Sequence, residues 1–161
     1  MSEPQNQSHS MTKRFKDRII PFLFKWEGTK LDLHPNDAGN YVNGKLVGTK
    51  YGIDARSHPK EDIANLTAER AIDIYWNEYW VKYGCDHLPQ NYDWAFFDAC
   101  VNCGFCRAMK IEKVSGLNVK KFMDERDAFY HRLVERRPAS KVFLKGWLNR
   151  TRDLRKHVLQ S

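Results

Sequence analysis

The sequence has no apolar run that approaches the roughly 18 residues of a membrane-spanning helix. Its first residues are polar and lack the basic-then-apolar order of a secretory signal peptide. It also contains no glycine-rich nucleotide loop, no serine nucleophile elbow, and no zinc-finger, KH or RRM signature. We therefore expect a chain that is made and kept in a cytoplasm, and these motifs give no reason to expect a nucleic-acid partner.

Acidic residues are fewer than basic ones, 20 Asp and Glu against 27 Lys and Arg, so the formal net charge is +7. Such an excess suits an anionic partner: nucleic acid, a membrane surface or the acidic bacterial envelope. Charge alone does not choose among these. With 161 residues, 42% hydrophobic and 13% aromatic, the chain has the size of one folded domain. Residues 1–11 are polar and aperiodic, so we expect a disordered leader followed by a single domain over 12–161.

Cysteine is scarce but clustered. Of four cysteines, Cys100, Cys103 and Cys106 follow one another at three-residue intervals, and Cys85 precedes them. Thiolates at this spacing can ligate zinc or an iron–sulfur cluster. However, residues 94–109 are apolar nearly all round, which predicts a central buried helix where cysteine packs as a small hydrophobe. A helix also points the three side chains in different directions, so we expect free thiols, no metal and no cofactor.

Apolar periodicity predicts a mostly α-helical chain, with helices over approximately 12–26, 67–81, 94–109, 122–136 and 140–159. Pro21 either kinks the first helix or makes its firm part begin near Ile20. Thr67 and Ser140 are good N-caps. The last helix is basic and amphipathic: Phe143, Trp147, Leu154 and Val158 share one side, and Lys145, Arg150, Arg152, Arg155 and Lys156 lie mostly elsewhere. A solvated face is the usual interpretation, although such a helix can also contact an anionic envelope.

A small sheet is expected between the first two helices. Asn43-Gly44 stands between short β-prone arms in residues 41–47, which is the strongest local hairpin signal in the sequence. Residues 49–53 would return beside it as a strand. In such a strand Thr49, Tyr51 and Ile53 share one face, because side chains alternate.

Two carboxylates in the stretch 25–53 stand in contrasting surroundings. Glu27 ends an apolar helical run beside Trp26, and a carboxyl that loses hydration there keeps its proton more readily, as a general acid must. Asp37 lies in the polar loop HPNDAG, where water and backbone amides keep it ionised. Glycoside hydrolysis uses such a pair. The plainer interpretation is a helix-end charge followed by a turn.

Asp98 and Asn102 stand four residues apart in the apolar stretch 94–109. Buried polar groups need partners. Either both bond backbone in the floor of a cleft, or Asn102 touches a substrate or orients the loop that bears Asp37.

A series of segments between about Phe15 and Leu154 carries a family resemblance: KWEG, PNDAG, GTKYGI, DIANLTAERAIDIYWNEYW, CDHLP, FFDACVNCG and FLKGWLNR. In this order they resemble glycoside hydrolase family 108, the phage-type N-acetylmuramidases with a lysozyme-like fold. The resemblance implies one lysozyme-like domain with the small sheet beside the active-site cleft. The part after the VNCG segment resembles a shortened peptidoglycan-binding region.

The resemblance also implies roles for individual residues. Glu27 matches the family's catalytic glutamate, Asp37 its loop aspartate and Thr49 its water-positioning threonine, while Tyr51 and Asn102 match substrate-binding positions. This sequence departs from the family pattern after Gly28, where the aromatic is missing, and it has extra residues around 41–47. Asp32 therefore stays open as an alternative to Asp37.

The implied activity is hydrolysis of the β-1,4 bond between N-acetylmuramic acid and N-acetylglucosamine in bacterial peptidoglycan. The implied biology is that of a monomeric phage endolysin, which leaves the host cytoplasm through a holin pore to reach the periplasm and cell wall. Three alternatives stay open: a lytic transglycosylase of the same fold, a non-catalytic wall-binding relative, and a basic nucleic-acid-binding protein.

Overall fold

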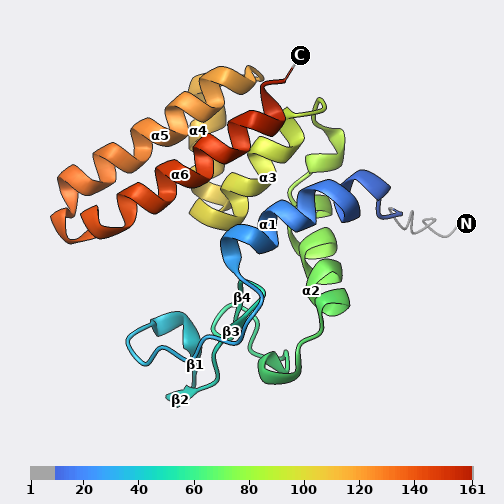
Figure 1. Cartoon of the computed structure of the whole chain (residues 1–161), viewed down its shortest axis with the longest axis vertical. Coiled ribbons are helices and arrows are strands. Elements are labelled where there is room, and N and C mark those ends of the chain that lie inside the picture. Colours follow the sequence, from blue (N-terminus) through green and yellow to red (C-terminus); the bar gives the residue numbers. More distant parts are fainter. Residues whose placement is uncertain (1–9, 161) are drawn as a thin grey trace, which may run out of the picture. The chain divides into compact units, whose positions relative to one another are not determined.

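Figure 1 shows the computed structural model of the chain, which describes residues 10–160. Helices dominate, and two small hairpins supply the strands, so the predicted mostly α fold class with a small β region is confirmed. The chain divides into two compact units, one up to Asn77 and one from Glu78. The predicted disordered leader lies outside the described residues, except for its last two positions. Among residues 10–160, every helix is too short or too polar to serve as a membrane span.

The first unit combines two helices with two hairpins. Its elements are α1 (Ile20–Glu27), β1 (Tyr41–Val42), β2 (Lys45–Leu46), β3 (Thr49–Lys50), β4 (Ile53–Asp54) and α2 (Ala68–Tyr75). β1 pairs antiparallel with β2, and β3 with β4. Side chains from both helices, from the segment before α1, from β4 and from the 3-10 turn Ile63–Asn65 contribute to the core, among them Phe15, Ile19, Leu23, Ile53, Ile63, Ile74 and Tyr75.

The first helix changes its geometry at Pro21. Phe15–Ile19 forms a π-helical segment, in which the Ile20 amide donates to the Phe15 carbonyl, and α1 begins at Ile20. Proline has no N–H, and its ring crowds the carbonyl four residues back, so a wider turn relieves the clash that a regular helix would have. Residues 13–27 are helical without a break, so the predicted alternative in which the firm helix begins near Ile20 is wrong, and the π-helical segment before Pro21 is how the helix accommodates the proline.

The Asn-Gly hairpin is confirmed. Tyr41 pairs with Leu46 and Val42 with Lys45. Asn43 and Gly44 have φ values of 49° and 78°, the left-handed backbone that a tight two-residue hairpin turn requires.

The single strand predicted over residues 49–53 is wrong. The chain turns back after Lys50, so that Thr49 pairs with Asp54 and Lys50 with Ile53. Tyr51 and Gly52 make the turn, with φ values of 53° and 76°. Tyrosine seldom adopts this left-handed backbone conformation, so the sequence gives no signal of a turn at Tyr51. The alternation that would put residues 49, 51 and 53 on one face is interrupted there.

The helix predicted from Thr67 is confirmed. The Thr67 hydroxyl accepts a hydrogen bond from the Arg70 amide at 3.1 Å, and α2 continues beyond Tyr75 as a π-helical segment, Trp76–Val81. The buried Tyr75 donates from its hydroxyl to the Tyr51 carbonyl at 2.8 Å. This bond ties the β3–β4 turn to α2.

The second unit contains α3 (Tyr92–Cys103), α4 (Phe105–Ser115), α5 (Val119–Arg136) and α6 (Lys141–Val158). The single helix predicted over 94–109 is wrong, because Gly104 divides it into α3 and α4. Gly104 has a φ of 87°, a backbone that glycine adopts without the penalty other residues have. The break turns the chain out of the core after Cys103.

The α5–α6 pair follows the prediction in its bounds but not in all its side chains. A short turn, Pro138–Ser140, joins the two helices, which contact each other along their length. Ser140 occupies the N-cap position, although its side chain makes no capping hydrogen bond. The prediction that Arg150 belongs with the cations on the solvated side of α6 is wrong: Arg150 is only 5% exposed and pairs with Asp98 of α3.

Candidate active site

Glu27 is the last residue of α1, so its carboxyl stands at a helix end as predicted. Gly28 ends the helix with a φ of 83°, and its amide donates to the Phe24 carbonyl at 2.9 Å. The Glu27 side chain is half-buried. It is therefore held by the fold while part of it stays accessible to a ligand.

Gly52, in the β3–β4 turn, lies directly against Glu27. A Cβ atom on Gly52 would stand 2.9 Å from Cβ and 3.0 Å from Cγ of Glu27, and 2.5 Å from the Tyr75 hydroxyl oxygen. These distances are shorter than van der Waals contact, so a larger residue would displace its neighbours. The absent side chain at this turn lets the stem of Glu27 rest on the hairpin that carries Thr49.

Thr49 is bound to the loop that precedes the hairpins. The Asp32 amide donates to the Thr49 carbonyl at 2.7 Å, and the Thr49 amide donates to the Asp32 carbonyl at 2.9 Å. The Thr49 hydroxyl donates to the side-chain oxygen of Asn40 at 2.6 Å. Because its proton is engaged, the hydroxyl oxygen can act toward a further ligand as an acceptor.

Asn40 organises this loop, and sequence reasoning missed it. Asn40 is fully buried, and its side-chain amide donates to the His34 backbone carbonyl at 3.0 Å. Its backbone carbonyl accepts from the backbone amides of Val47 and Gly48. An asparagine in a turn-rich stretch gives little signal of burial. Only the folded structure shows that the Asn40 side chain holds the Thr49 hydroxyl by a hydrogen bond.

Asp37 lies on the exposed side of the same loop. Its carboxylate accepts from the Gly39 amide at 2.9 Å and caps the short 3-10 turn Ala38–Asn40. Asp54 of β4, which sequence reasoning also missed, lies nearby: Oδ1 of Asp37 and Oδ2 of Asp54 are 3.2 and 3.4 Å from the position of a Cβ on Gly39. Asp32, the alternative to Asp37, accepts from the His34 amide at 3.0 Å.

Tyr51 is half-buried in the β3–β4 turn. Its ring centroid lies 5.1 Å from that of Phe24 and 5.7 Å from the Lys50 Nζ atom. The β3–β4 hairpin thus connects the predicted residues of the first unit: Glu27 rests on its turn, Tyr51 is part of the turn, Thr49 begins it, and Asp37 lies near its open end beside Asp54.

Asn102 belongs to the second unit, where its side-chain oxygen accepts from Arg126 at 3.2 Å and from the Tyr130 hydroxyl. The buried Asp98 carboxylate accepts from Arg126 at 2.8 Å and from Arg150 at 2.9 Å. The alternative in which these two polar residues bond backbone is therefore wrong, because their partners are side chains. Burial raises the pKa of Asp98, but the neighbouring guanidinium groups of Arg150 and Arg126 lower it further, to below its ordinary value.

The four cysteines are free thiols and differ in burial. Burial raises the pKa of Cys85 and of Cys100, which keeps both protonated. Cys103 is half-buried and Cys106 is exposed, so the expectation of buried packing is wrong for Cys106, which lies beyond the break at Gly104. Between residues 10 and 160, no cluster of His, Cys, Asp and Glu side chains has the arrangement of a metal site.

A helix-end glutamate resting on a small hairpin, with further carboxylates on the adjoining loop, is the kind of site that glycoside hydrolases use. The family model described as Glycosyl hydrolase 108 matches residues 20–104, which include every predicted site residue. The chain belongs to this family, as the sequence resemblance predicted. It is therefore a glycoside hydrolase of a peptidoglycan-hydrolysing family.

Among solved structures, the chain is similar to SagA of Brucella abortus, with 26% sequence identity and a TM-score of 0.69. The match covers 92% of this chain and 95% of that one, and it supports the lysozyme-like fold over both units. The comparison with curated proteins found no match.

Proposed function

We propose that the protein is an N-acetylmuramidase, which hydrolyses the β-1,4 bond between N-acetylmuramic acid and N-acetylglucosamine. The position of Glu27 carries this proposal: it is half-buried at the end of α1, with its stem against Gly52 of the hairpin that bears Thr49. A general acid has to approach the leaving oxygen from a fixed direction and still be reached by a polymer.

In this proposal Glu27 donates its proton to the glycosidic oxygen as the bond to the anomeric carbon breaks. Asp37 orients or activates water, or stabilises the positive charge that develops at the anomeric centre. The Thr49 hydroxyl, which donates to Asn40, accepts a hydrogen bond from that water and holds it. Tyr51 offers an aromatic ring to a pyranose face, and Asn102 is the proposed substrate contact of the second unit.

The products of peptidoglycan digestion test the bond specificity. We expect muropeptides that end in a hydrated, reducing N-acetylmuramic acid when the purified chain digests isolated walls and the products are weighed by mass spectrometry. Anhydro ends would make the protein a lytic transglycosylase, and reducing N-acetylglucosamine ends would assign the other glycosidic bond. Sedimentation with walls without cleavage would leave only wall binding.

Gly52→Ala should reduce the rate of wall digestion at least tenfold and destabilise the first unit by about 2–4 kcal/mol, because it adds a clash to an unfavourable φ. Gly44→Ala is the matched control: its φ of 78° is nearly that of Gly52, but an added Cβ there meets nothing within 4 Å. It should show only backbone strain, about 1–2 kcal/mol, with little change in rate. Urea denaturation and reducing-end release measure both variants; equal effects would mean that the Gly52 contact does not position Glu27.

We further propose that the protein acts as a monomeric phage endolysin, made in the host cytoplasm and released to the periplasm and cell wall through a holin pore. The resemblance to phage-type muramidases supports this role. Lysis of a bacterial host that depends on a co-expressed pore protein is the outcome that would bear it out.

A further inference from the structure

The second unit carries a pocket of about 510 Å³ whose charged lining is entirely positive. Arg107 and Lys110 of α4, Arg136 at the end of α5 and the following Arg137 supply its cations. Phe129 and Leu133 of α5 supply apolar lining, and the Arg107 guanidinium lies 4.3 Å from the Phe129 ring centroid. Among the described residues that line the pocket, none is an aspartate or a glutamate.

Other cations of this unit have carboxylate partners. The buried Arg126 and Arg150 share Asp98, and Arg155 pairs with Asp124 and Asp127. Within residues 10–160, the four pocket cations form no such pair. The dipole of α5 stabilises cations near its C-terminus, but it leaves this concentration of positive charge uncompensated. Four cations around one hollow raise the local potential for an anion.

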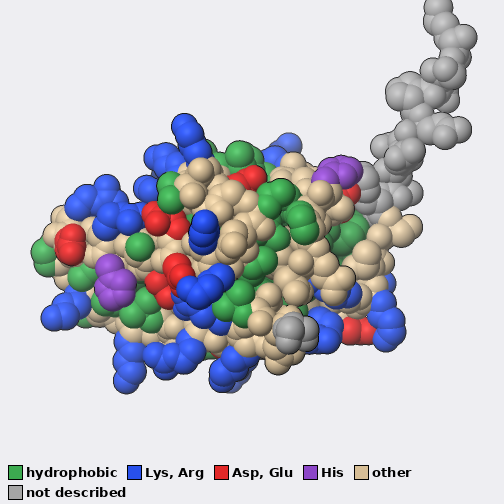
Figure 2. All heavy atoms as spheres, turned by 90° about the horizontal axis from the view of Figure 1, so that it is seen from above, with side chains coloured by type: hydrophobic (Ala, Val, Ile, Leu, Met, Phe, Trp, Pro, Cys, Tyr) green, Lys and Arg blue, Asp and Glu red, His purple; other side chains and the backbone are tan. Residues whose placement is uncertain are grey.

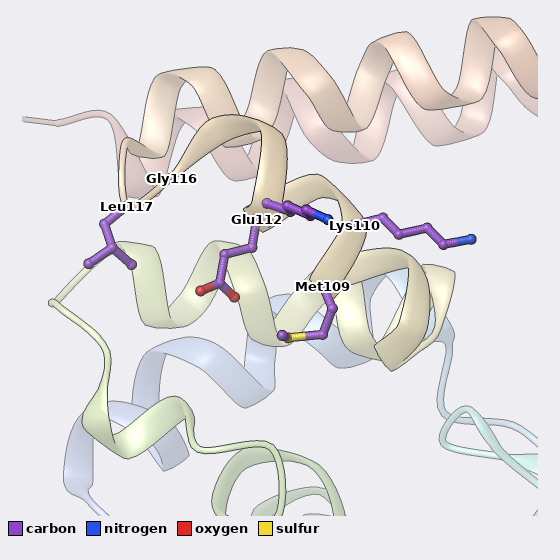
Figure 3. A pocket seen from close by; sticks show the side chains of 6 residues that line it. Met109, Lys110, Glu112, Gly116 and Leu117 are labelled. Atoms are coloured by element: carbon purple, nitrogen blue, oxygen red, sulfur yellow. The ribbon is translucent and has the colours of Figure 1, made fainter.

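On the face of the protein that Figure 2 shows, Lys and Arg side chains are more numerous than Asp and Glu side chains. A different pocket of about 400 Å³, also on α4, serves as a contrast. In Figure 3, Met109, Glu112 and Leu117 surround it, so it is largely apolar and has a carboxylate on its wall. The pocket lined by Arg136 and Arg137 differs from this one in having four cations and no carboxylate in its lining.

A few residues after Arg136 and Arg137, the first turn of α6 exposes two apolar side chains. Val142 is 79% and Phe143 is 59% exposed, directly after the turn Pro138–Ser140. The Phe143 ring lies 5.8 Å from Trp147, which belongs to the α6 side that packs on α5. Lys141 and Lys145 flank the pair and are exposed. The α5–α6 corner, residues 136–145, is thus an apolar point surrounded by cations.

We propose that the α5–α6 corner docks on an anionic phospholipid membrane, with a headgroup phosphate in the cationic pocket and Val142 and Phe143 among the headgroups. Guanidinium groups bind phosphate oxygens in bidentate fashion, so Arg136 and Arg137 suit this ligand. Exposed apolar side chains lose water on entering the interfacial region, and neighbouring cations are attracted to its charge. This docking is independent of the chemistry at Glu27.

The proposal is narrower than contact along the whole basic helix. In the second half of α6, Arg150 is buried with Asp98 and Arg155 is paired with Asp124 and Asp127. Those cations are already engaged by the fold. Arg152 and Lys156 stay exposed there, but only the beginning of α6, together with the end of α5, combines exposed cations with the exposed apolar side chains of Val142 and Phe143.

Co-sedimentation of the full chain with vesicles tests the docking. We expect binding to vesicles that contain phosphatidylglycerol and none to vesicles of phosphatidylcholine alone. R136Q/R137Q should lower the partition coefficient about tenfold or more, because each cation near an anionic surface contributes substantially. V142S/F143S should lower it severalfold without any change in charge. Thermal denaturation should show both variants folded, since the four side chains are at the surface or line an open pocket.

The matched control is R152Q/K156Q, which removes the same charge from exposed positions of α6. Along the helix, Arg152 lies about 10 Å and Lys156 about 16 Å from Lys145, the last residue of the corner, and both distances exceed the screening length of about 8 Å at physiological salt. A loss below about twofold is expected. If the control lowered the partition coefficient as much as R136Q/R137Q does, overall charge would explain vesicle binding and the proposal would be overturned. Saturation of the pocket by inorganic phosphate or an RNA oligonucleotide, without vesicle binding, would overturn it too.

Discussion

Glu27→Gln is expected to lower the rate of peptidoglycan cleavage by about 10²- to 10⁴-fold, the range that a positioned general acid contributes. Glutamine has nearly the same shape, so the contact with Gly52 and the end of α1 are preserved, and only the transferable proton is lost. Release of reducing ends from purified walls gives the rate, and circular dichroism confirms the fold. Glu69→Gln, which neutralises an exposed glutamate in the first turn of α2, should change the rate less than twofold.

Clearing of walls by Glu27→Gln at the wild-type rate would remove Glu27 from the role of acid. The second carboxylate is tested in the same assay with Asp37→Asn and Asp32→Asn. Both side chains accept one local amide hydrogen bond, from Gly39 and His34, so the loss of such a bond is matched between them. We expect the larger loss of rate for Asp37→Asn; the reverse order would assign the second role to Asp32.

The local signals in the sequence predicted local structure well. Asn43-Gly44 predicted a hairpin because few dipeptides accept two successive left-handed residues, and Thr67 predicted a helix start because its hydroxyl can accept the orphan amide of Arg70. The turn at Tyr51 was missed because its backbone is held by distant groups. The Tyr75 hydroxyl, 24 residues further along the chain, donates a hydrogen bond to the Tyr51 carbonyl and so helps to hold the turn.

The sequence predicted several residues of the site, but it did not predict the contacts and hydrogen bonds that connect them. Nothing local indicates that Asn40 is buried, or that the carboxylates of Asp37 and Asp54 both lie close to Gly39. Arg150 shows the same limit in another way. The sequence analysis grouped it with the cations away from the apolar side of α6, although it stands three residues after Trp147 and four before Leu154. A charged residue is assigned to the solvent unless its partner is known, and Asp98 lies 52 residues away.

Asp98→Asn is expected to destabilise the second unit by about 3–5 kcal/mol. Asp98 is the buried counter-charge of Arg126 and Arg150, and removing its charge takes from these two buried guanidinium groups the carboxylate that they share. Urea denaturation followed by circular dichroism measures the loss. Asp124→Asn is the matched control, because Asp124 also pairs with two cations, Lys120 and Arg155, but is half exposed. Its loss should stay below about 1 kcal/mol, as for other surface pairs.

The Asp98 carboxylate should also make the folding stability depend on pH. The pKa of Asp98 in the folded chain lies below its ordinary value of 3.8, so the ionised form is stabilised by folding. This contribution is complete above about pH 4 and is lost as the pH falls through the lower folded value. Wild type should therefore lose stability between pH 4 and pH 2, and Asp98→Asn should lose less over that interval, because asparagine does not titrate. Two outcomes would show that the Asp98 cluster is not what holds α3, α5 and α6 together. One is that the stability of wild type and of Asp98→Asn falls equally between pH 4 and pH 2. The other is that Asp124→Asn loses as much stability as Asp98→Asn.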